Sequence, residues 1–392
     1  MNTPKIRFKG FTDDWEQRKL EDVAEFLDTM RKPLEGARRI PGPYPYYGAS
    51  GIVDYVDGYL FNEELVLLSE DGANITDRNY PVCFLASGKY WVNNHAHVLR
   101  LKDGNENNFV CTSLERKDYK QYNSGMAMPK LNQEVCRRIP IGCPSFNEQK
   151  KIGDYFRELD NLITLHQRKC DETKQLKKFM LQKMFPKNGE KNPKIRFEGF
   201  TDDWEQRKFS ELVTIERGGS PRPIDRFITK EENGLNWIKI GDAPEQGNYI
   251  TKTEEKIKPE GLSKTREVHP GDLILSNSMS FGRPYILAID GCIHDGWLAI
   301  RDTEKRFDLK FLCTLLGTDN MLSQYKAMAA GSTVNNLNKE LVGATTVSYP
   351  VMDEQVKLGE FFDGIDHLIT LHQRKCEKLK ALKKFMLQNM FI

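Results

Sequence analysis

A long segment with the pattern of an amphipathic helix occurs twice in the chain. The first copy follows Pro144 and the second follows Pro350, and they align without a gap at an offset of 206 residues. Neither copy contains an internal proline, so we predict helices from about 147 to 185 and from about 353 to 391. At 1.5 Å of rise per residue, each helix is roughly 55–60 Å long, which exceeds the usual helix of a globular domain.

The apolar residues of both copies recur every seven positions and form a wide stripe that needs a partner helix. Because the chain itself supplies a second copy, we predict an intramolecular antiparallel coiled coil. Homodimerisation through the same stripe is the alternative. In the antiparallel arrangement the mid-helix histidines would meet. The residues predicted to pack are Ile152, Leu159, Leu162, His166, Leu176, Leu358, Ile365, Leu368, His372 and Leu382.

A second repeat lies upstream of each helix. Pro4–Lys19 returns as Pro193–Lys208 and differs only at Lys9 and Glu198. The two segments that lie between this motif and the helix differ in length and share almost no sequence. Two unlike domains therefore stand on like scaffolds. We expect a first globular domain at 1–145, a helix at 146–186, a linker at 187–192, a second globular domain at 193–350 and a helix at 351–392.

Short strand-like runs and turn residues fill both variable segments. We predict strands at Leu65–Leu68, Lys89–Leu101 and Asn236–Asp242, and a helix at Asp308–Leu316. This mixture is typical of compact α+β domains, so the expected fold class is α+β with a pseudo-twofold internal repeat.

Composition limits the class of protein. The formal charge of +2 does not by itself indicate a nucleic-acid binder. The 8 cysteines include no CxxC pair, and no apolar run reaches the length of a membrane span. We therefore expect a reduced, cytoplasmic protein with no contact with a membrane and no zinc site.

Motifs of catalysis and cofactor binding are missing from the sequence. There is no GxxxxGK[ST] loop, HExxH, GxSxG, or GxGxxG after a strand. His95 and His97 share one face of a predicted strand, but no acidic or cysteine partner is evident nearby, so we predict no metal. No cofactor is expected.

Polar residues suited to contact phosphates or base edges group in the loops of both variable segments. An ordinary loop role is equally compatible with each one, and the prediction rests on their grouping in both halves. The candidates in the first half are Tyr46, Tyr47, Asn74, Arg78, Asn93, Asn94 and Lys130. The candidates in the second half are Arg217, Ser220, Arg222, Asn277, Arg283, Ser332 and Asn335.

Taken together, these pieces resemble the specificity (S) subunit of type I restriction–modification systems over essentially the whole chain. The resemblance is carried by DDWEQRKL, by YPYYGASG, and by HPGDLILSN with FGRP. It is also carried by GMAMPKLNQE and GSTVNNLNKE, which lead into the two helices.

The resemblance implies two target-recognition domains, each of which reads one half of an asymmetric double-stranded DNA site, with the helices as the spacer. It also implies two modification (methyltransferase) subunits that methylate adenine N6, and restriction (motor/nuclease) subunits that join them. This chain would be non-catalytic. A methyltransferase or nuclease fused to its reader would need the motifs that are missing. The remaining alternative is a coiled-coil assembly scaffold with protein-binding domains.

Overall fold

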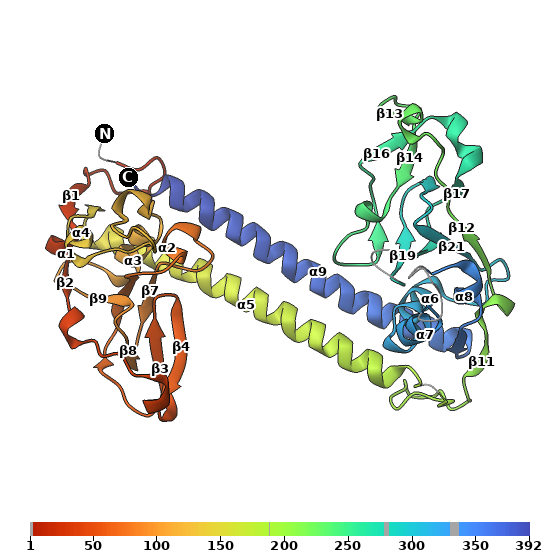
Figure 1. Cartoon of the computed structure of the whole chain (residues 1–392), viewed down its shortest axis with the longest axis horizontal. Helices are drawn as coiled ribbons and strands as arrows, with labels where there is room; N and C mark the ends of the chain where they lie inside the picture. Colours follow the sequence, from red (N-terminus) through yellow and green to blue (C-terminus); the bar gives the residue numbers. More distant parts are fainter. Residues whose placement is uncertain (1–2, 188, 278–281, 330–336) are drawn as a thin grey trace. The chain divides into compact units, whose positions relative to one another are not determined.

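A computed structural model describes residues 3–187, 189–277, 282–329 and 337–392. The chain divides into two compact units. The first unit comprises Met1–His166 and Lys375–Ile392, and the second comprises Gln167–Arg374. Both ends of the chain therefore belong to the first unit (Figure 1). Each unit combines sheets and helices, which confirms the expected α+β fold class.

The first unit is built on two four-stranded sheets, with strand orders β2-β9-β6-β7 and β4-β3-β8-β5, and has a two-stranded sheet β1-β10. Its strands are β1 Glu16–Lys19, β2 Ala24–Phe26, β3 Pro41–Gly48, β4 Gly51–Val56, β5 Phe61–Asn62, β6 Leu65–Ser69, β7 Cys83–Ala86, β8 Lys89–Val92, β9 Ala96–Leu101 and β10 Pro140–Cys143. Its short helices are α1 Leu20–Val23, α2 Asn74–Asp77, α3 Asn107–Glu115 and α4 Gln133–Arg137, with 3-10 turns η1 Asp28–Met30, η2 Gly36–Arg38 and η3 Tyr119–Tyr122.

The second unit has two five-stranded sheets, with strand orders β12-β21-β18-β19-β15 and β13-β16-β14-β20-β17, and a two-stranded sheet β11-β22. Its strands are β11 Glu205–Lys208, β12 Thr214–Arg217, β13 Ile228–Thr229, β14 Leu235–Ile238, β15 Tyr249–Ile250, β16 Glu255–Ile257, β17 Arg266–Val268, β18 Leu273–Ser276, β19 Pro284–Leu287, β20 Gly291–Ile293, β21 Trp297–Arg301 and β22 Thr346–Tyr349. Its short helices are α6 Leu309–Leu316, α7 Asp319–Ala329 and α8 Lys339–Gly343, with 3-10 turns η4 Phe209–Glu211, η5 Ile224–Arg226, η6 Ile240–Asp242 and η7 Pro259–Lys264.

The two units share one topology although their sequences differ. In the first sheet of each, β2-β9-β6-β7 corresponds to β12-β21-β18-β19, and all neighbours are antiparallel. In the second sheet, β4-β3-β8-β5 corresponds to β16-β14-β20-β17, with one parallel pair at the centre of each.

The central strands are buried on both faces, and successive side chains point to opposite sides. In β6, Val66 and Leu68 join the core next to the helices, whereas Leu65 and Leu67 pack toward the second sheet. The predicted single strand at 89–101 is wrong, because a turn at residues 93–95 divides it into β8 and β9. The alternation of buried and exposed types of residue continues on both sides of the turn, so the sequence pattern does not reveal the break.

The two long helices are α5 Phe146–Met184 and α9 Met352–Asn389. In the first unit the beginning of α5 packs with the end of α9, and the Nζ atom of Lys383 lies 2.5 Å from Asp160 Oδ1. In the second unit the end of α5 packs with the beginning of α9, and Lys177 Nζ lies 2.6 Å from Asp366 Oδ1. The two ion pairs occupy equivalent positions, and the predicted antiparallel pairing within one chain is confirmed.

The packed seam of the helices is narrower than the predicted stripe. The first predicted column is buried at Ile152, Leu159, Leu358 and Ile365. Its neighbours in the seam are Phe156, Cys170, Phe362, Ile369 and Cys376, which are also buried. The other predicted column, Leu162, Leu176, Leu368 and Leu382, is instead between 41 and 50% exposed. A wide apolar stripe contains two neighbouring columns of residues, and heptad spacing alone does not determine which column faces the partner helix.

The two histidines that were predicted to meet lie in different units. His166 lies in the first unit and His372 in the second. Their meeting stays a prediction.

Each repeated motif is clamped onto the start of a long helix. Arg7 forms a two-pronged ion pair with Glu148, with Nε–Oε1 at 2.7 Å and Nη2–Oε2 at 2.8 Å. Arg196 repeats the pair with Glu354 at 2.9 and 2.7 Å. Both carboxylates are only 1% exposed. The motif strands add backbone pairing, because β1 pairs with β10 and β11 pairs with β22 immediately before each helix.

A glycine in each long helix lets a shorter helix approach closely. A Cβ atom at Gly153 would lie 2.1 Å from Glu106 Oε2, and one at Gly359 would lie 2.3 Å from Asp308 Oδ1. Glu106 and Asp308 are the N-cap residues of α3 and α6, and their carboxylates accept N–H bonds in the first turn. Glycine at this position costs helix stability but is the residue that leaves room for the cap.

An aromatic cluster closes each unit around the end of a long helix. In the first unit, Phe391 packs against Trp15, Phe109 and Phe156. In the second unit, Phe185 packs in the same way against Trp204, Phe311 and Phe362. Each repeated motif therefore holds the start of one long helix and the end of the other.

We expect Arg196→Ala to destabilise the second unit by about 3–5 kcal/mol, because it leaves the buried Glu354 carboxylate without its partner. Replacing both residues with methionine removes the charge as well as the pair, so we expect the double variant to lose far less. Urea unfolding of the full chain followed by tryptophan fluorescence measures both. The control is Arg207→Ala, which removes an exposed pair with Glu205. Equal unfolding midpoints for Arg196→Ala and the control would contradict the clamp.

Candidate nucleic-acid interface

Polar residues gather at the same edge of both units, where three chain segments are tied together by equivalent backbone hydrogen bonds. In the first unit the N–H of Glu70 donates to His95 O at 2.9 Å, and the N–H of Leu131 donates to Glu70 O at 2.7 Å. In the second unit the backbone N–H of Asn277 donates to Gly296 O at 2.9 Å, and the backbone N–H of Leu337 donates to Asn277 O at 3.0 Å.

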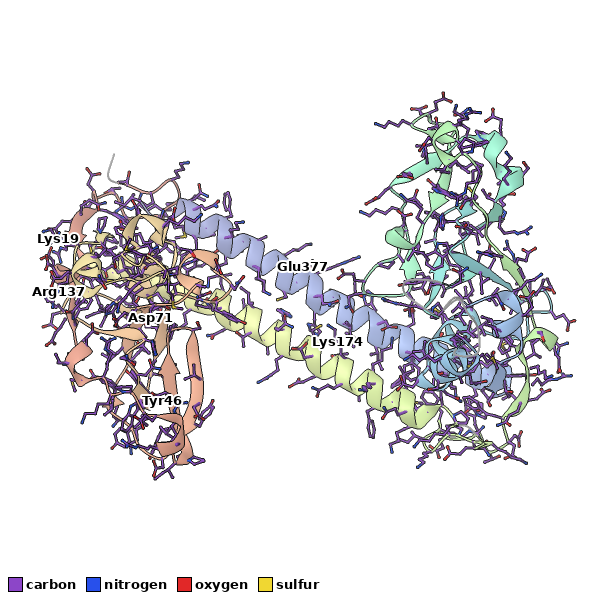
Figure 2. The ribbon with its side chains drawn as sticks, in the orientation of Figure 1. Lys19, Tyr46, Asp71, Arg137, Lys174 and Glu377 are labelled. Atoms are coloured by element: carbon purple, nitrogen blue, oxygen red, sulfur yellow. The ribbon has the colours of Figure 1, made fainter. Side chains whose placement is uncertain are left out.

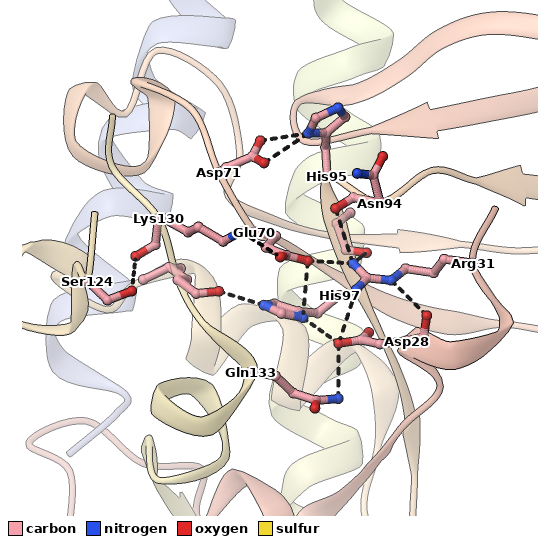
Figure 3. Close-up of polar contacts among 12 residues, drawn as sticks. Asp28, Arg31, Glu70, Asp71, Asn94, His95, His97, Ser124, Lys130 and Gln133 are labelled. Atoms are coloured by element: carbon pink, nitrogen blue, oxygen red, sulfur yellow. Dashed lines mark hydrogen bonds and ion pairs between the residues drawn. The ribbon is translucent and has the colours of Figure 1, made fainter. Parts of the chain in front are cut away.

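We name these two edges by their residues. The first polar edge comprises Asp28, Arg31, Glu70, Asp71, Asn94, His95, His97, Lys130 and Gln133 (Figure 3). The second polar edge comprises Arg217, Ser220, Arg222, Asn277, His294 and Asp295.

His97 is the buried centre of the first polar edge. Its Nδ1 lies 2.6 Å from Asp28 Oδ2, and its Nε2 lies 2.7 Å from Leu131 O. Both partners are acceptors, so both ring nitrogens donate and the ring is an imidazolium. Burial is the largest single influence on the pKa of His97 and lowers it. The hydrogen bond to Asp28, the contact with Cys136 and the charge of Asp28 together outweigh burial, and the pKa is raised to about 10. Burial conversely raises the pKa of Asp28, but His97, the N–H of Val98 and the charge of Arg31 together bring it below its ordinary value.

Further charges surround this pair. Arg31 Nη1 donates to Glu70 Oε2 and to Ala96 O, both at 2.7 Å (Figure 3). Lys130 Nζ lies 3.3 Å from the other oxygen of Glu70. Gln133 Nε2 donates to Asp28 Oδ2 at 3.1 Å. The network joins η1, the end of β6, β9 and the segment before α4.

Both histidines of this edge have acidic partners, which corrects the sequence analysis. His97 pairs with Asp28, and His95 Nδ1 lies 2.9 Å from both oxygens of Asp71. These partners are 69 and 24 residues away in sequence, so local inspection missed them. Within the ranges that the structure describes, no group of three His, Cys, Asp or Glu side chains has an arrangement that could hold a metal ion.

Asp295 is the centre of the second polar edge. Its backbone oxygen accepts from Arg217 Nε at 3.4 Å and from Asn277 Nδ2 at 2.8 Å. Its carboxylate accepts from Ser220 Oγ at 3.0 Å and lies 3.9 Å from Arg222 Nη2. Four predicted residues thus meet around a residue that was not predicted. The Arg222 side chain is 75% exposed and presents its guanidinium to solvent.

The glycines of ERGGSPRP permit close backbone approach. A Cβ atom at Gly218 would lie 2.2 Å from His294 O, and one at Gly219 would lie 2.4 Å from Lys264 O. The loop therefore packs tightly beside Asp295. This position fixes where Arg217 and Arg222 emerge.

Other predicted residues lie away from the polar edges or support the loops around them. Tyr46 is 1% exposed, and its hydroxyl accepts from Leu34 N–H at 2.9 Å. It belongs to β3, whereas Asp71 follows β6, and Figure 2 shows the two in different parts of the first unit. Tyr47 packs against Phe84 and Tyr90.

The remaining polar candidates of the first unit shape its turns. Asn74 both donates to Tyr80 O at 2.9 Å and accepts from Tyr80 N at 2.8 Å. Arg78 pairs with Glu115 at 2.8 Å. Asn93 is buried and accepts from His95 N–H at 2.8 Å, whereas Asn94 is exposed.

In the second unit, Arg283 donates to Glu245 O at 2.9 Å and stacks over Tyr285, so it does not join Asp295. Ser332 and Asn335 lie outside the described residues.

Sequence reasoning missed the residues that organise each edge, notably Asp28, Arg31, Glu70 and Asp295. A usable signal exists for Asp295, because a short polar turn, His294–Gly296, interrupts two apolar strand runs. Asp28 carries no such signal, since its role depends on a contact with the distant β9.

Among the helices that the structure describes, none is long and apolar enough to cross a membrane.

The protonated His97 predicts a pH-dependent stability. Its pKa is about 10 in the folded chain against 6.5 ordinarily, so its contribution is present in full below pH 6.5 and is lost as the pH rises through about 10. We expect His97→Gln to cost a few kcal/mol near pH 7 and much less near pH 10. Urea unfolding of both proteins across this range measures the difference, with the half-exposed His95→Gln as control. A constant difference at all pH values would show that His97 is neutral.

Comparison with known proteins places these features in a family. The family model described as "Type I restriction modification DNA specificity domain" matches residues 12–175 and again residues 201–381. A putative type I restriction enzyme specificity subunit of Haemophilus influenzae is 27% identical over 92% of this chain and 89% of its own length. The MjaVIII specificity subunit of Methanocaldococcus jannaschii is 24% identical over 95% of this chain and 91% of its own length.

Solved structures agree in fold. The crystal structure of the type I restriction–modification S subunit of M. genitalium aligns with a TM-score of 0.72 at 15% identity, over 100% of this chain and 99% of that one. A chain from a structure of type I complex assembly aligns with a TM-score of 0.53 at 17% identity, over 98% and 99%. Because the family model matches both halves, the chain belongs to the type I restriction–modification specificity (S) subunits, the non-catalytic DNA-specificity components of these systems.

Proposed function

We propose that this S subunit reads a bipartite, asymmetric DNA site, with one half-site for each polar edge, and directs adenine N6 methylation and restriction by partner subunits. The observation that carries the proposal is that two units of equal topology hold different side chains at the same place. The S-adenosylmethionine chemistry belongs to the modification subunits in this proposal.

The second polar edge suits readout of a base edge. Arg217 Nε lies 3.4 Å from the backbone oxygen of Asp295, and Arg222 Nη2 lies 3.9 Å from the Asp295 carboxylate, both long distances. Such loose contacts orient the guanidinium groups without occupying all their N–H donors. A planar fork of this kind matches the O6 and N7 acceptors of guanine or a phosphate.

The first polar edge offers different donors. Asn94 and His95 are exposed on the turn before β9. The Lys130 ammonium lies 3.3 Å from Glu70 Oε1, and the backbone N–H of Glu70 donates to His95 O. We propose the exposed candidates as DNA contacts and the buried ones, Tyr46, Asn93 and Asn277, as supports for the loops. The assignment extends to Ser332 and Asn335 on sequence grounds alone.

We further propose that residues 1–145 and 193–350 act as the target-recognition domains and that 146–186 and 351–392 act as the spacer. A coiled-coil scaffold with protein-binding domains is the alternative function. It predicts no discrimination between DNA sequences. A gel-shift assay of the assembled complex with matched and scrambled duplexes therefore separates the two functions.

Docking of two modification subunits is supported by a duplicated apolar surface. Leu162, Leu382 and Phe385 lie within two residues of the Asp160–Lys383 ion pair in the first unit. Leu368, Leu176 and Phe179 lie equivalently around Asp366–Lys177 in the second unit. All six side chains are 41–53% exposed. Identical exposed apolar sets suit identical partners, and restriction subunits would join through the resulting core.

We expect the double variant Arg217→Ala/Arg222→Ala to relax only one half of the methylated motif. The chain and its modification subunits are expressed in a host free of adenine methylation, and methylated adenines are then sequenced. Loss of two guanidinium contacts is expected to weaken discrimination at the affected positions by about 1–3 kcal/mol each. The control is Arg207→Ala on β11. Relaxation of both halves together would contradict independent readers.

We expect Leu162→Glu/Phe385→Glu to remove one modification subunit from the purified complex, because a charge opposes burial of this surface. Light scattering counts the subunits. The matched variant Leu368→Glu/Phe179→Glu removes the equivalent surface of the second unit and should give the same loss. Glu158→Gln, an exposed change on α5, is the control. Full complement of partners in both double variants would place docking elsewhere.

A further inference from the structure

The loop Asn123–Lys130 of the first unit is closed by its own hydrogen bonds. Asn123 Oδ1 accepts from the N–H groups of Gly125 and Lys130, both at 2.9 Å. Ser124 contributes two bonds to Lys130 O, from its N–H at 2.8 Å and from its hydroxyl at 3.0 Å. A Cβ atom at Gly125 would lie 1.8 Å from Met128 O, so glycine is required where the chain crosses itself.

The stem of this loop is fixed to the first polar edge. The N–H of Leu131 donates to Glu70 O at 2.7 Å, and Leu131 O accepts from the buried His97 ring at 2.7 Å. Gly72 N–H donates to Pro129 O at 3.0 Å, and an isolated β-bridge joins Asp71 to Lys130. The loop is therefore held at its stem as well as within itself.

Two methionines stand on this closed loop. Met126 is fully exposed and Met128 is 61% exposed. A single exposed apolar side chain is ordinary on a protein surface. Here, however, two unbranched apolar side chains are displayed on a braced loop that ends at the partly exposed Lys130. Lys130 bridges to Asp71, which is the ion-pair partner of His95. Little conformational freedom of the backbone remains to be lost when they bind.

The second half of the chain distinguishes the kind of ligand. In sequence, Gly331 aligns with Gly125, and Ser332 and Val334 stand where the first half has Met126 and Met128. The exposed apolar side chains on the long helices are, by contrast, identical in the two halves. A surface for two identical protein partners is expected to be duplicated, whereas a surface for two different half-sites is not. This difference favours DNA as the ligand of the methionine loop.

We infer that Met126 and Met128 form a wedge that enters the duplex at the first half-site and partly unstacks one base step. Methionine is among the apolar side chains that proteins insert between base pairs, and its flexible thioether fits an irregular gap. The Lys130 ammonium at the root of the loop is placed to contact a phosphate. The inference rests on the proposed reading of the first half-site by this unit, and it adds indirect readout, because steps differ in how easily they unstack.

The test uses the complex with its modification subunits and duplexes that carry 2-aminopurine at successive positions of the site. This base fluoresces more strongly when it is unstacked. The wild-type complex is expected to raise fluorescence at one step of the first half-site. Met126→Ala/Met128→Ala should abolish that rise and weaken Kd about tenfold. A duplex with a mismatch at the same step is already unstacked, so there the loss of affinity should largely disappear.

Two controls accompany the alanine variant. Met126→Leu/Met128→Leu keeps an apolar wedge and should retain both the fluorescence rise and the affinity. Met352→Ala removes an exposed methionine from the second unit and should change neither. Urea midpoints equal to that of the wild type establish that the loop changes leave folding intact.

Each contrary outcome overturns a specific statement. Unchanged affinity and fluorescence in the alanine variant would overturn the wedge. So would failure of that variant to assemble with the modification subunits, which would make the loop a protein-docking element. A fluorescence rise confined to the second half-site would overturn the assignment to the first unit. If the wild-type complex failed to distinguish matched from scrambled duplexes, the proposed reading function itself would fail, and the wedge with it.

Discussion

The buried ion pairs Arg7–Glu148 and Arg196–Glu354 are the constraint on which the rest of the architecture depends. Each carboxylate stands at the start of a long helix and is almost inaccessible to water, so its charge is tolerable only with the arginine in place. The pair ties the start of the helix to the repeated motif that precedes the globular segment. The adjacent strand pairing and aromatic cluster then bring the end of the other helix to the same place.

Some features of the two units are duplicated in sequence and structure, whereas others differ between the units. Four features recur in both units: the arginine–glutamate ion pair, the glycine that leaves room for an N-cap carboxylate, the packed helix seam and the exposed leucines. The sheets recur in topology but not in sequence, and the polar edges differ in every charged side chain that organises them. His97 and Asp28 form a buried ion pair in one unit, whereas Asp295 contacts two arginines in the other. Within each unit, the duplicated side chains and the differing side chains therefore lie on separate surfaces.

Much of the fold was predictable because it is local or repeated. Helix length followed from periodicity and missing prolines, and the antiparallel partner followed from the duplication. The seam was only half predicted, since Leu162 and Phe156 occupy neighbouring columns and differ in burial for tertiary reasons. The polar edges were foreseen as groups of loop residues, and four members of the second edge do meet. Their organisers, such as Asp28, were not foreseen, because a contact across 69 residues leaves no local pattern.

The composition of the first unit has a consequence for biosynthesis. Residues 167–374 form the second unit without a break, so all of its chain has been translated before the end of α9 is made. The first unit begins earlier but lacks Phe391 and its neighbours until residues 375–392 have been translated. The Trp15 and Phe109 rings therefore lack their packing partner Phe391 until synthesis is nearly complete. A frameshift late in the gene therefore damages the unit whose coding begins first, while residues 167–374 remain intact.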